Sequence, residues 1–292
     1  SAGGKAVTAP GLARGYARLA AGRTTVIADA APPPGGADSL NAHASTLAIE
    51  VTSGRRPLIV NCGSGAPFGE DWHRAGRATP SHSTLCIRGV SSSRLGRPRL
   101  RRWDPRELLL LDAPDQVWAQ SDADLDAIRL LIGHNGYAGT HGLTHVRQLA
   151  LSNDGRSLSG EDTLGVMTAL DRKVFAQLLA KTQQPGIRFD IRFHLHPDAD
   201  AALDLGGTAV SVALRSGELW VFRHDGVAAL SLEPSVYLQA GRADPRPTRQ
   251  IVLSAMVSDY ACQIGWTLAK AQDTPAAIRD TAEDEPADAD AS

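Results

Sequence analysis

Hydrophobic and polar positions alternate with a period of two along most of the chain. In residues 45–52 single small or polar residues separate Leu47, Ile49 and Val51. Successive side chains of a strand point to opposite faces, so this pattern is typical of a strand with one buried face. Further strands are predicted at 57–61, 84–89, 127–137, 144–152, 187–196, 208–226, 227–238 and 248–257, with two more around a turn at Gly22-Arg23 within 15–31.

Only residues 163–184 show the period of an amphipathic helix, and this segment ends before Pro185-Gly186. Many short strands with regular turns and a single helix predict an all-β fold, an antiparallel two-sheet β-sandwich with one inserted helix. Residues 62–83 are predicted to form a long loop, and loops of that length are often functional. Residues 91–107 are basic and rich in turn formers, which predicts a solvated loop.

Composition places limits on organisation and partners. The 292 residues are 42% hydrophobic, enough for one large β domain or two small ones, and the net charge of -2 gives no sign of a nucleic-acid partner. No run reaches the ~18 apolar residues of a membrane span. We expect a flexible leader at 1–14, a β domain at 15–270, and an acidic disordered tail at 271–292. The cysteines are far apart, which favours buried free thiols: Cys62, Cys86 and Cys262.

Candidate chemistry is concentrated in histidines near strand ends. His43 precedes the 45–52 strand, Asn61 ends the next strand, and His82 opens the strand after the long loop. The two strands are joined by the connection "SGRR" at residues 53–56. If this loop has an odd number of residues, Asn61 lies on the same sheet face as His43; if it has an even number and no bulge, Asn61 lies on the opposite face. Two imidazoles and an oxygen ligand suit a zinc-like ion. The alternative is a hydrogen-bonded network of three polar residues at strand ends.

Three other groups of residues could have either a functional or a structural role. His194 and His196 share one face of a strand, where they could bind a metal, line a groove or form a polar sheet face. Tyr137 and His134 offer a phenol–imidazole pair for acid–base chemistry, or a structural aromatic at a strand end. In the long loop His73, Arg74 and Arg77 could contact an acidic polysaccharide or form ordinary surface pairs.

Five blocks in order then resemble the C-terminal domain of heparinase II/III-like polysaccharide lyases. They are "GYARLAAGRTTVIADAAPPP", "AHASTLAIEVTSGRRPLIVNCG", "RATPSHSTLCI", "HNGY…GLTHVRQLALSNDGRSLSGEDTL" and "IRFHLHPD…W". The resemblance implies a super-sandwich β domain that partners an α/α toroid. It also implies β-elimination of uronic-acid-containing polysaccharides such as glycosaminoglycans, in a periplasmic or cell-envelope location.

The resemblance also implies roles for individual residues. His43 matches a zinc-binding histidine, Asn61 an aspartate ligand and His82 the last ligand, while Asn41 stands where a histidine acts near the sugar. Asn41 and Asn61 therefore alter the chemistry of the site. We expect a β-sandwich domain that contributes to lyase activity only together with a toroid, which this sequence does not show. The competing expectation is a non-catalytic carbohydrate-binding or structural module.

Overall fold

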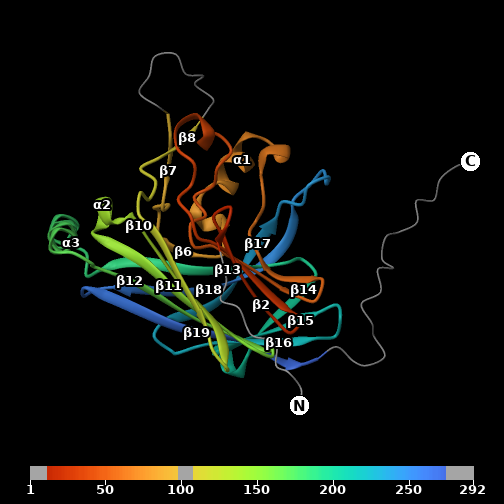
Figure 1. Cartoon of the computed structure of the whole chain (residues 1–292). Helices are drawn as coiled ribbons and strands as arrows, with labels where there is room; N and C mark the ends of the chain where they lie inside the picture. Colours follow the sequence, from red (N-terminus) through yellow and green to blue (C-terminus); the bar gives the residue numbers. More distant parts are fainter. Residues whose placement is uncertain (1–11, 98–107, 274–292) are drawn as a thin grey trace, which may run out of the picture.

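The computed structural model describes residues 12–97 and 108–273, which form two antiparallel β-sheets packed face to face (Figure 1). The strands of the first sheet are β1 (Leu12–Ala13), β2 (Tyr16–Ala21), β3 (Thr24–Asp29), β4 (Ile49–Ser53), β5 (Arg56–Val60), β6 (Leu85–Ile87), β13 (Ile187–Leu195), β17 (Ala229–Tyr237) and β18 (Arg246–Val257). They run in the order β1-β2-β3-β4-β5-β13-β18-β17, and β6 pairs with β13.

The second sheet has eight strands in the order β14-β15-β16-β19-β12-β11-β10-β9. They are β9 (Val117–Ala123), β10 (Ala127–Tyr137), β11 (Leu143–Ser152), β12 (Ser157–Gly165), β14 (Ala199–Asp204), β15 (Ala209–Leu214), β16 (Leu219–His224) and β19 (Ala261–Gln272). A small third sheet pairs β7 (Arg94–Gly96) with β8 (Leu109–Leu111). The predicted all-β, antiparallel two-sheet sandwich is confirmed.

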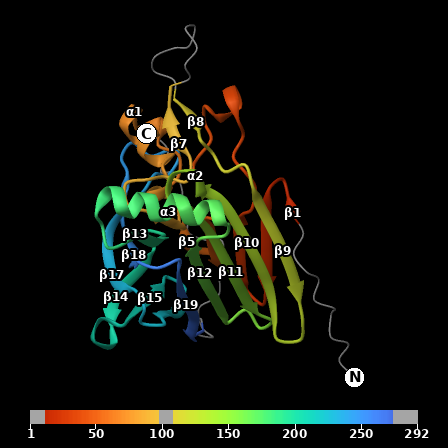
Figure 2. The same ribbon diagram turned by 90° about the vertical axis from the view of Figure 1, so that its left-hand side faces the viewer.

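Helical segments connect and cover the sheets. The α-helices are α1 (Glu70–Gly76), α2 (Ala138–His141) and α3 (Ala169–Thr182), and the 3-10 turns are η1 (Gly36–Ser39), η2 (Ala66–Phe68), η3 (Thr79–Ser81) and η4 (Leu205–Gly207). Figure 2 shows α3 and α2 together at one end of β10 and β11. Gly142, which follows α2, has a φ of +66°, and a Cβ there would lie 2.1 Å from the Asp171 carbonyl oxygen of α3. This position therefore requires glycine.

The core lies between the two sheets and is continuous. Phe193 of β13 packs with its ring centroid 4.7 Å from that of Trp266 in β19 and 5.0 Å from that of Phe222 in β16. All three side chains are at most 2% exposed. Edge-to-face and tilted aromatic contacts of this kind add to the hydrophobic stabilisation of the burial itself. The period-two pattern of the sequence thus predicts the inward faces correctly.

Several local predictions differ from the structure. The helix begins at Ala169 rather than 163, because 157–165 belongs to β12 and the Thr168–Asp171 capping box starts the helix. The predicted long loop at 62–83 contains α1, η2 and η3. Strand β4 starts at Ile49, because Leu47 has a left-handed φ of +65° inside a turn.

The ends of the described chain also modify the predicted boundaries. Strand β1 falls within the predicted leader 1–14, and β19 extends to Gln272, inside the predicted tail 271–292. The remainder of the leader and tail, and residues 98–107 of the basic loop, lie outside the described residues. Cys62 and Cys86 are buried free thiols, as predicted, and Cys262 is a half-buried one. In the described part of the chain, every helix is too short or too polar to cross a membrane.

Candidate functional site

A cavity of about 810 Å³ opens beside the segment that connects β3 to β4. The four residues Asn41, His43, Asn61 and His82, which come from three separate segments, all line it. Its other polar lining residues are Arg14, Tyr16, Asp29, Asp38, Ser45, Glu50 and Ser64. The structure therefore gathers in one place the three predicted metal ligands, His43, Asn61 and His82, and Asn41, which the resemblance places near the sugar.

Buried Arg77 fixes the segment that carries Asn41 and His43. Its guanidinium donates hydrogen bonds to the carbonyl oxygens of Ser39, Ala42 and Leu108 at 2.6, 2.8 and 2.8 Å. Its own carbonyl accepts from the Ala44 N–H at 2.8 Å. These contacts use three of the five N–H donors of the guanidinium, and Arg77 is only 2% exposed. Arg77 therefore anchors the cavity wall and presents no free guanidinium to a ligand, unlike the predicted polysaccharide contact.

The two cavity histidines contact each other directly. His43 Nδ1 lies 3.0 Å from His82 Nε2, and the rings are perpendicular. His82 Nδ1 lies 2.9 Å from the Ala78 carbonyl oxygen. Because a carbonyl oxygen only accepts, Nδ1 of His82 carries the proton and its Nε2 accepts a hydrogen bond from His43. In the neutral pair this contact therefore uses the lone pair of His82 Nε2.

Burial makes both imidazoles weak bases. Burial is the main cause that lowers the pKa of His82 to about 3, with His43 as a second cause. The pKa of His43 is lowered by burial and by the nearby Arg77 charge, and the nearby Gly76 backbone only partly offsets these effects. Loss of water disfavours a charged imidazolium. Both rings are therefore neutral near pH 7.

Asn61 reaches the cavity through an irregular hairpin. The β4–β5 turn has the two residues Gly54-Arg55, and the register shifts between Val51 and Thr52, so the connection is even with a bulge. The Asn61 amide donates to Glu50 Oε1 at 3.0 Å, and its Oδ1 accepts from the Ser83 N–H at 2.8 Å. Both ends of the amide are thus engaged by the protein.

Carboxylates give the cavity an acidic character. Asp29 Oδ2 accepts from the Ser45 hydroxyl at 2.6 Å, and burial raises the pKa of Asp29. The Asp29 charge is the main cause that raises the pKa of Tyr16, followed by burial and by the Glu50 charge. These charges identify Asp29 and Glu50 as neighbours of the Tyr16 phenol. The lining contains three carboxylates and, apart from the neutral histidines, the single cation Arg14.

The donor set does not fit a complete zinc site. Protein zinc sites use three or four nitrogen, sulfur or carboxylate ligands. Here the two imidazoles hydrogen-bond each other, and Asn61 offers only an amide oxygen that already accepts a backbone N–H. Within residues 12–97 and 108–273, no group of three or more His, Cys, Asp or Glu side chains is placed to hold a metal ion.

Comparison with known proteins identifies the family of this chain. The heparinase II/III-like C-terminal family matches residues 5–267. The chain belongs to this family. The domain is also 35% identical over 260 residues to FtsZ-localized protein C of Caulobacter vibrioides, which covers 88% of this chain and 42% of that protein. This heparinase II/III-like domain thus spans less than half the length of that curated relative.

Solved structures show the same fold at low identity. The heparan sulfate lyase HepC of Pedobacter heparinus superposes with a TM-score of 0.64 at 14% identity, covering 94% of this chain and 38% of that one. A heparinase III described as the BT4657 gene product superposes with a TM-score of 0.63 at 11% identity, covering 91% and 36%. These likenesses establish the sandwich architecture of the heparinase II/III-like domain.

The phenol–imidazole pair of the sequence analysis lies away from the cavity, in the interior. Tyr137 and His134 are fully buried, with ring centroids 5.5 Å apart. The Tyr137 hydroxyl donates to the Leu85 carbonyl oxygen, and His134 Nδ1 accepts from the Gly136 N–H. Neither side chain lines the cavity that contains Asn41. In this arrangement the heparinase II/III-like domain uses both as structural groups.

The remaining predicted binding residues also lie outside the cavity lining. His73 is half-buried and Arg74 exposed on α1. His194 is 2% exposed, with Nδ1 2.8 Å from the Ser235 hydroxyl and Nε2 2.9 Å from the Pro80 carbonyl oxygen. His196 packs against Tyr237 and accepts from the Asp198 N–H. The two strand histidines therefore support structure behind the cavity rather than lining a groove.

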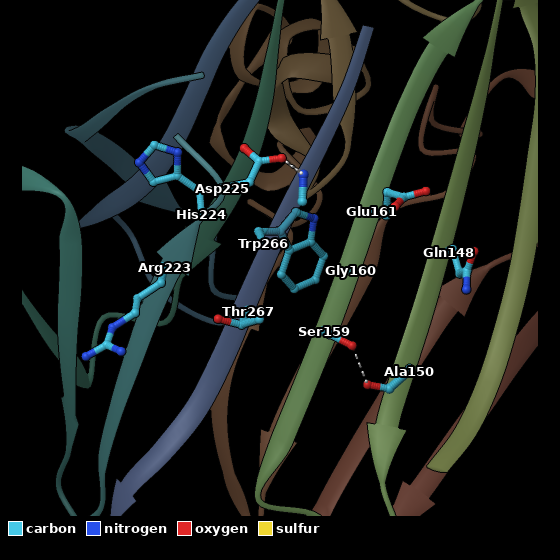
Figure 3. A pocket seen from close by; sticks show the side chains of 11 residues that line it. Gln148, Ala150, Ser159, Gly160, Glu161, Arg223, His224, Asp225, Trp266 and Thr267 are labelled. Carbon is cyan, nitrogen blue, oxygen red and sulfur yellow. Dashed lines mark hydrogen bonds between the residues drawn. The ribbon is translucent and has the colours of Figure 1, made fainter. Parts of the chain in front are cut away.

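A second hollow, of about 430 Å³, lies on the outer face of the second sheet (Figure 3). Figure 3 shows Gln148, Glu161, Arg223 and Thr267 on neighbouring strands, with Asp225 hydrogen-bonded to the backbone of β19. It contains none of the residues that the sequence analysis selected. We therefore regard the cavity with His43 as the candidate site.

Sequence reasoning missed several residues that shape the candidate site. Asp29 ends β3, and Glu50 is a polar position of the alternating strand β4. The alternation itself was a usable signal for Glu50, because it places that side chain on the solvent face. Asp29 gave no such signal, because its contact with Ser45 depends on the turn before β4.

Proposed function

We propose that this domain binds a polysaccharide in the His43 cavity as the β-sandwich half of a heparinase II/III-like protein, without supplying the catalytic base or metal of a lyase. The observation that carries the proposal is the convergence of Asn41, His43, Asn61 and His82 on one cavity. Arg77 and the Asn61 hydrogen bonds hold these groups in fixed positions. A preorganised polar cavity of this kind suits a sugar rich in hydroxyl groups.

The chemistry of β-elimination favours this non-catalytic proposal over a catalytic contribution. A lyase must remove the C5 proton of a uronate and stabilise negative charge beside its carboxylate. In this cavity the histidines are weak bases, Asn41 has no basic nitrogen, and three carboxylates oppose a single arginine. Such a lining binds a glycan more readily than it activates a uronate.

The glycan cleft needs a second wall, which this domain does not supply. The domain covers 42% of its curated relative and 38% of the HepC chain, so most of each relative lies outside the matched region. We infer that an α/α toroid domain, in the same chain or another, forms the opposite wall of the glycan cleft. A polysaccharide ligand and a periplasmic or cell-envelope location are the family expectations that this proposal carries forward, although the three carboxylates of the lining favour a neutral glycan over an acidic one.

Calorimetric titration of this chain with defined oligosaccharides tests the proposal. Heparan sulfate, oligouronate and neutral oligosaccharides should be compared, and the formation of unsaturated uronate product should be followed by its ultraviolet absorbance. Wild-type protein should bind at least one glycan and form no product. His43→Ala should abolish binding, whereas Glu161→Gln, in the hollow of the other sheet, should not. Product formation by the chain alone would establish the catalytic alternative instead.

Metal analysis supplies an independent measurement for the same site. If the donor set is incomplete, protein loaded with zinc and then dialysed should retain much less than one zinc ion per chain. Asn61→Asp restores a carboxylate ligand and should raise zinc retention. Stoichiometric zinc in the wild type that is lost in His82→Ala would show that the two imidazoles suffice.

A second candidate function follows from the curated relative, whose name describes localisation with FtsZ. We propose that the protein containing this domain localises with FtsZ. Fluorescent fusions of the domain and of the whole protein, imaged together with labelled FtsZ, test this. Fusion to reporters active in only one compartment tests the cell-envelope location in the same cells.

A further inference from the structure

The two sheets are joined beneath the cavity by a buried arginine. Arg147 of β11 is fully buried and faces Asp162 directly across the β11–β12 pair. Its Nε lies 2.7 Å from Asp162 Oδ1 and its Nη2 3.1 Å from Oδ2, a bidentate ion pair. Asp162 also accepts from His145 Nε2 at 2.7 Å and Trp266 Nε1 at 2.9 Å. The second sheet therefore holds the guanidinium rigidly.

The free edge of this guanidinium reaches the first sheet. Arg147 Nη1 donates to the Leu47 carbonyl oxygen at 2.8 Å and to the Ser83 carbonyl oxygen at 3.0 Å. Leu47 ends the turn that follows His43, and Ser83 follows His82 immediately. A single group thus contacts the backbone next to His82 and at the end of the turn four residues after His43, although Arg147 itself does not line the cavity.

Two further details show that these carbonyl contacts hold a specific geometry. Leu47 has a left-handed φ of +65°, which is costly for a residue with a branched side chain and persists only where its surroundings fix it. The Ser83 N–H donates to Asn61 Oδ1, so the same peptide segment also orients the third cavity residue. Movement of either carbonyl would therefore shift His43, Asn61 and His82 relative to one another.

We propose that Arg147 is a positioning residue of the His43 cavity, which sets the contact between the His43 and His82 rings from the opposite sheet. The inference deepens the proposed function, because it identifies what prearranges the glycan-binding groups. It does not depend on which glycan binds. Two contacts distinguish Arg147 from an ordinary core ion pair. It donates to two carbonyl oxygens that flank the cavity, and its partner Asp162 accepts four hydrogen bonds.

Imidazole nitrogen NMR of the 292-residue chain tests the proposal. Arg147→Met keeps the length of the side chain but removes the carbonyl contacts, so the nitrogen shifts of His43 and His82 should move toward those of a histidine without the ring–ring hydrogen bond. Arg147→Lys should move them in the same direction by a smaller amount. It is also the variant to use if Arg147→Met fails to fold.

The matched control is Lys270→Met, which removes another buried cation. Lys270 pairs with Glu218 at 3.2 Å and contacts Ser53, and it does not line the cavity. This control should lower the melting temperature but leave the ring nitrogen shifts of His43 and His82 unchanged. Folded Arg147→Met and Arg147→Lys proteins with wild-type ring shifts would overturn the proposal.

Glycan affinity gives a second readout. For a glycan that binds the wild type, Arg147→Met should weaken binding at least tenfold, and Lys270→Met should change it less than threefold. Equal losses in the two variants would mean that Arg147 acts only through general stability, and would also overturn the proposal. If no glycan binds the wild type, the proposed function fails while the NMR experiment still decides the role of Arg147.

Discussion

Acidification should destabilise this domain well above the pH at which its carboxylates titrate. Burial is the main cause that lowers the pKa of His82 to about 3 and that of His194 to about 4. In the unfolded chain each histidine titrates near its ordinary value of about 6.5. Between these values the unfolded chain binds protons that the folded domain does not. The free energy of unfolding therefore falls as the pH falls below about 6.5.

The size of the effect follows from proton linkage. From pH 7 to pH 5, one histidine whose pKa drops from about 6.5 to 4 or below loses about 2 kcal/mol of stabilisation. His82 and His194 together should therefore lower the free energy of unfolding by about 4 kcal/mol over this range. Asp29 acts in the opposite direction, because burial raises its pKa and the folded state then binds the extra proton. A loss of about 4 kcal/mol is large against the 5–15 kcal/mol typical of a domain.

Urea unfolding at pH 7, 6 and 5, followed by tryptophan fluorescence and circular dichroism, measures this slope. His194→Gln can still donate to the Pro80 carbonyl and accept from Ser235, but it does not titrate. It should lower stability at pH 7 and remove about 2 kcal/mol of the loss between pH 7 and 5, because His82, His134 and the other buried histidines still take up protons on unfolding. Val212→Ala, a core substitution without a titratable group, should lower stability at every pH by the same amount. A free energy of unfolding that is constant or increases from pH 7 to 5 would refute the reasoning.

Four substitutions probe other parts of the fold. Asp162→Asn leaves a buried guanidinium without its counter-charge and should cost about 3–5 kcal/mol in urea unfolding; a loss below 1 kcal/mol would contradict the ion-pair assignment. Phe193→Ala opens a cavity at the centre of the core and should cost about 3–5 kcal/mol by the same measurement. Gly142→Ala forces a Cβ toward the start of α3, so the melting temperature should fall more than in Gly139→Ala, where a Cβ meets open space. Thr168→Ala removes the N-cap of α3 and should cost about 1 kcal/mol, visible as a lower midpoint of thermal unfolding.

The architecture was predictable from the sequence because the period-two pattern records which side of each strand is buried. Strands β2, β3, β10 and β11 follow from such alternation and from turns of glycine, asparagine and aspartate. Strands β9, β14 and β19 were not foreseen. The outer position of β9 and β14 in the second sheet leaves them half-exposed and without a regular apolar face, whereas the alternation of Ile264, Trp266 and Leu268 in β19 was a signal that was overlooked.

The candidate site was only partly predictable. The family resemblance selected Asn41, His43, Asn61 and His82, but strand periodicity did not explain how they meet, since the left-handed turn at Leu47 breaks the alternation before β4. Arg147 carried an overlooked signal. It occupies an inward position between apolar residues of β11, and Asp162 does so on the neighbouring strand β12. Opposite charges on two inward faces of one hairpin predict a buried pair, and the pairing register then places them opposite each other.

The origin of the cavity lining has a practical consequence for protein engineering. Every lining residue lies between positions 14 and 82, so the recognition surface is encoded by a short, contiguous stretch of gene. Its support nevertheless comes from Arg147 and Asp162, far downstream. This stretch could be grafted onto another scaffold, or exchanged between homologues to alter ligand preference. Either change would succeed only if the second sheet of the recipient supplies an equivalent buried arginine–aspartate pair.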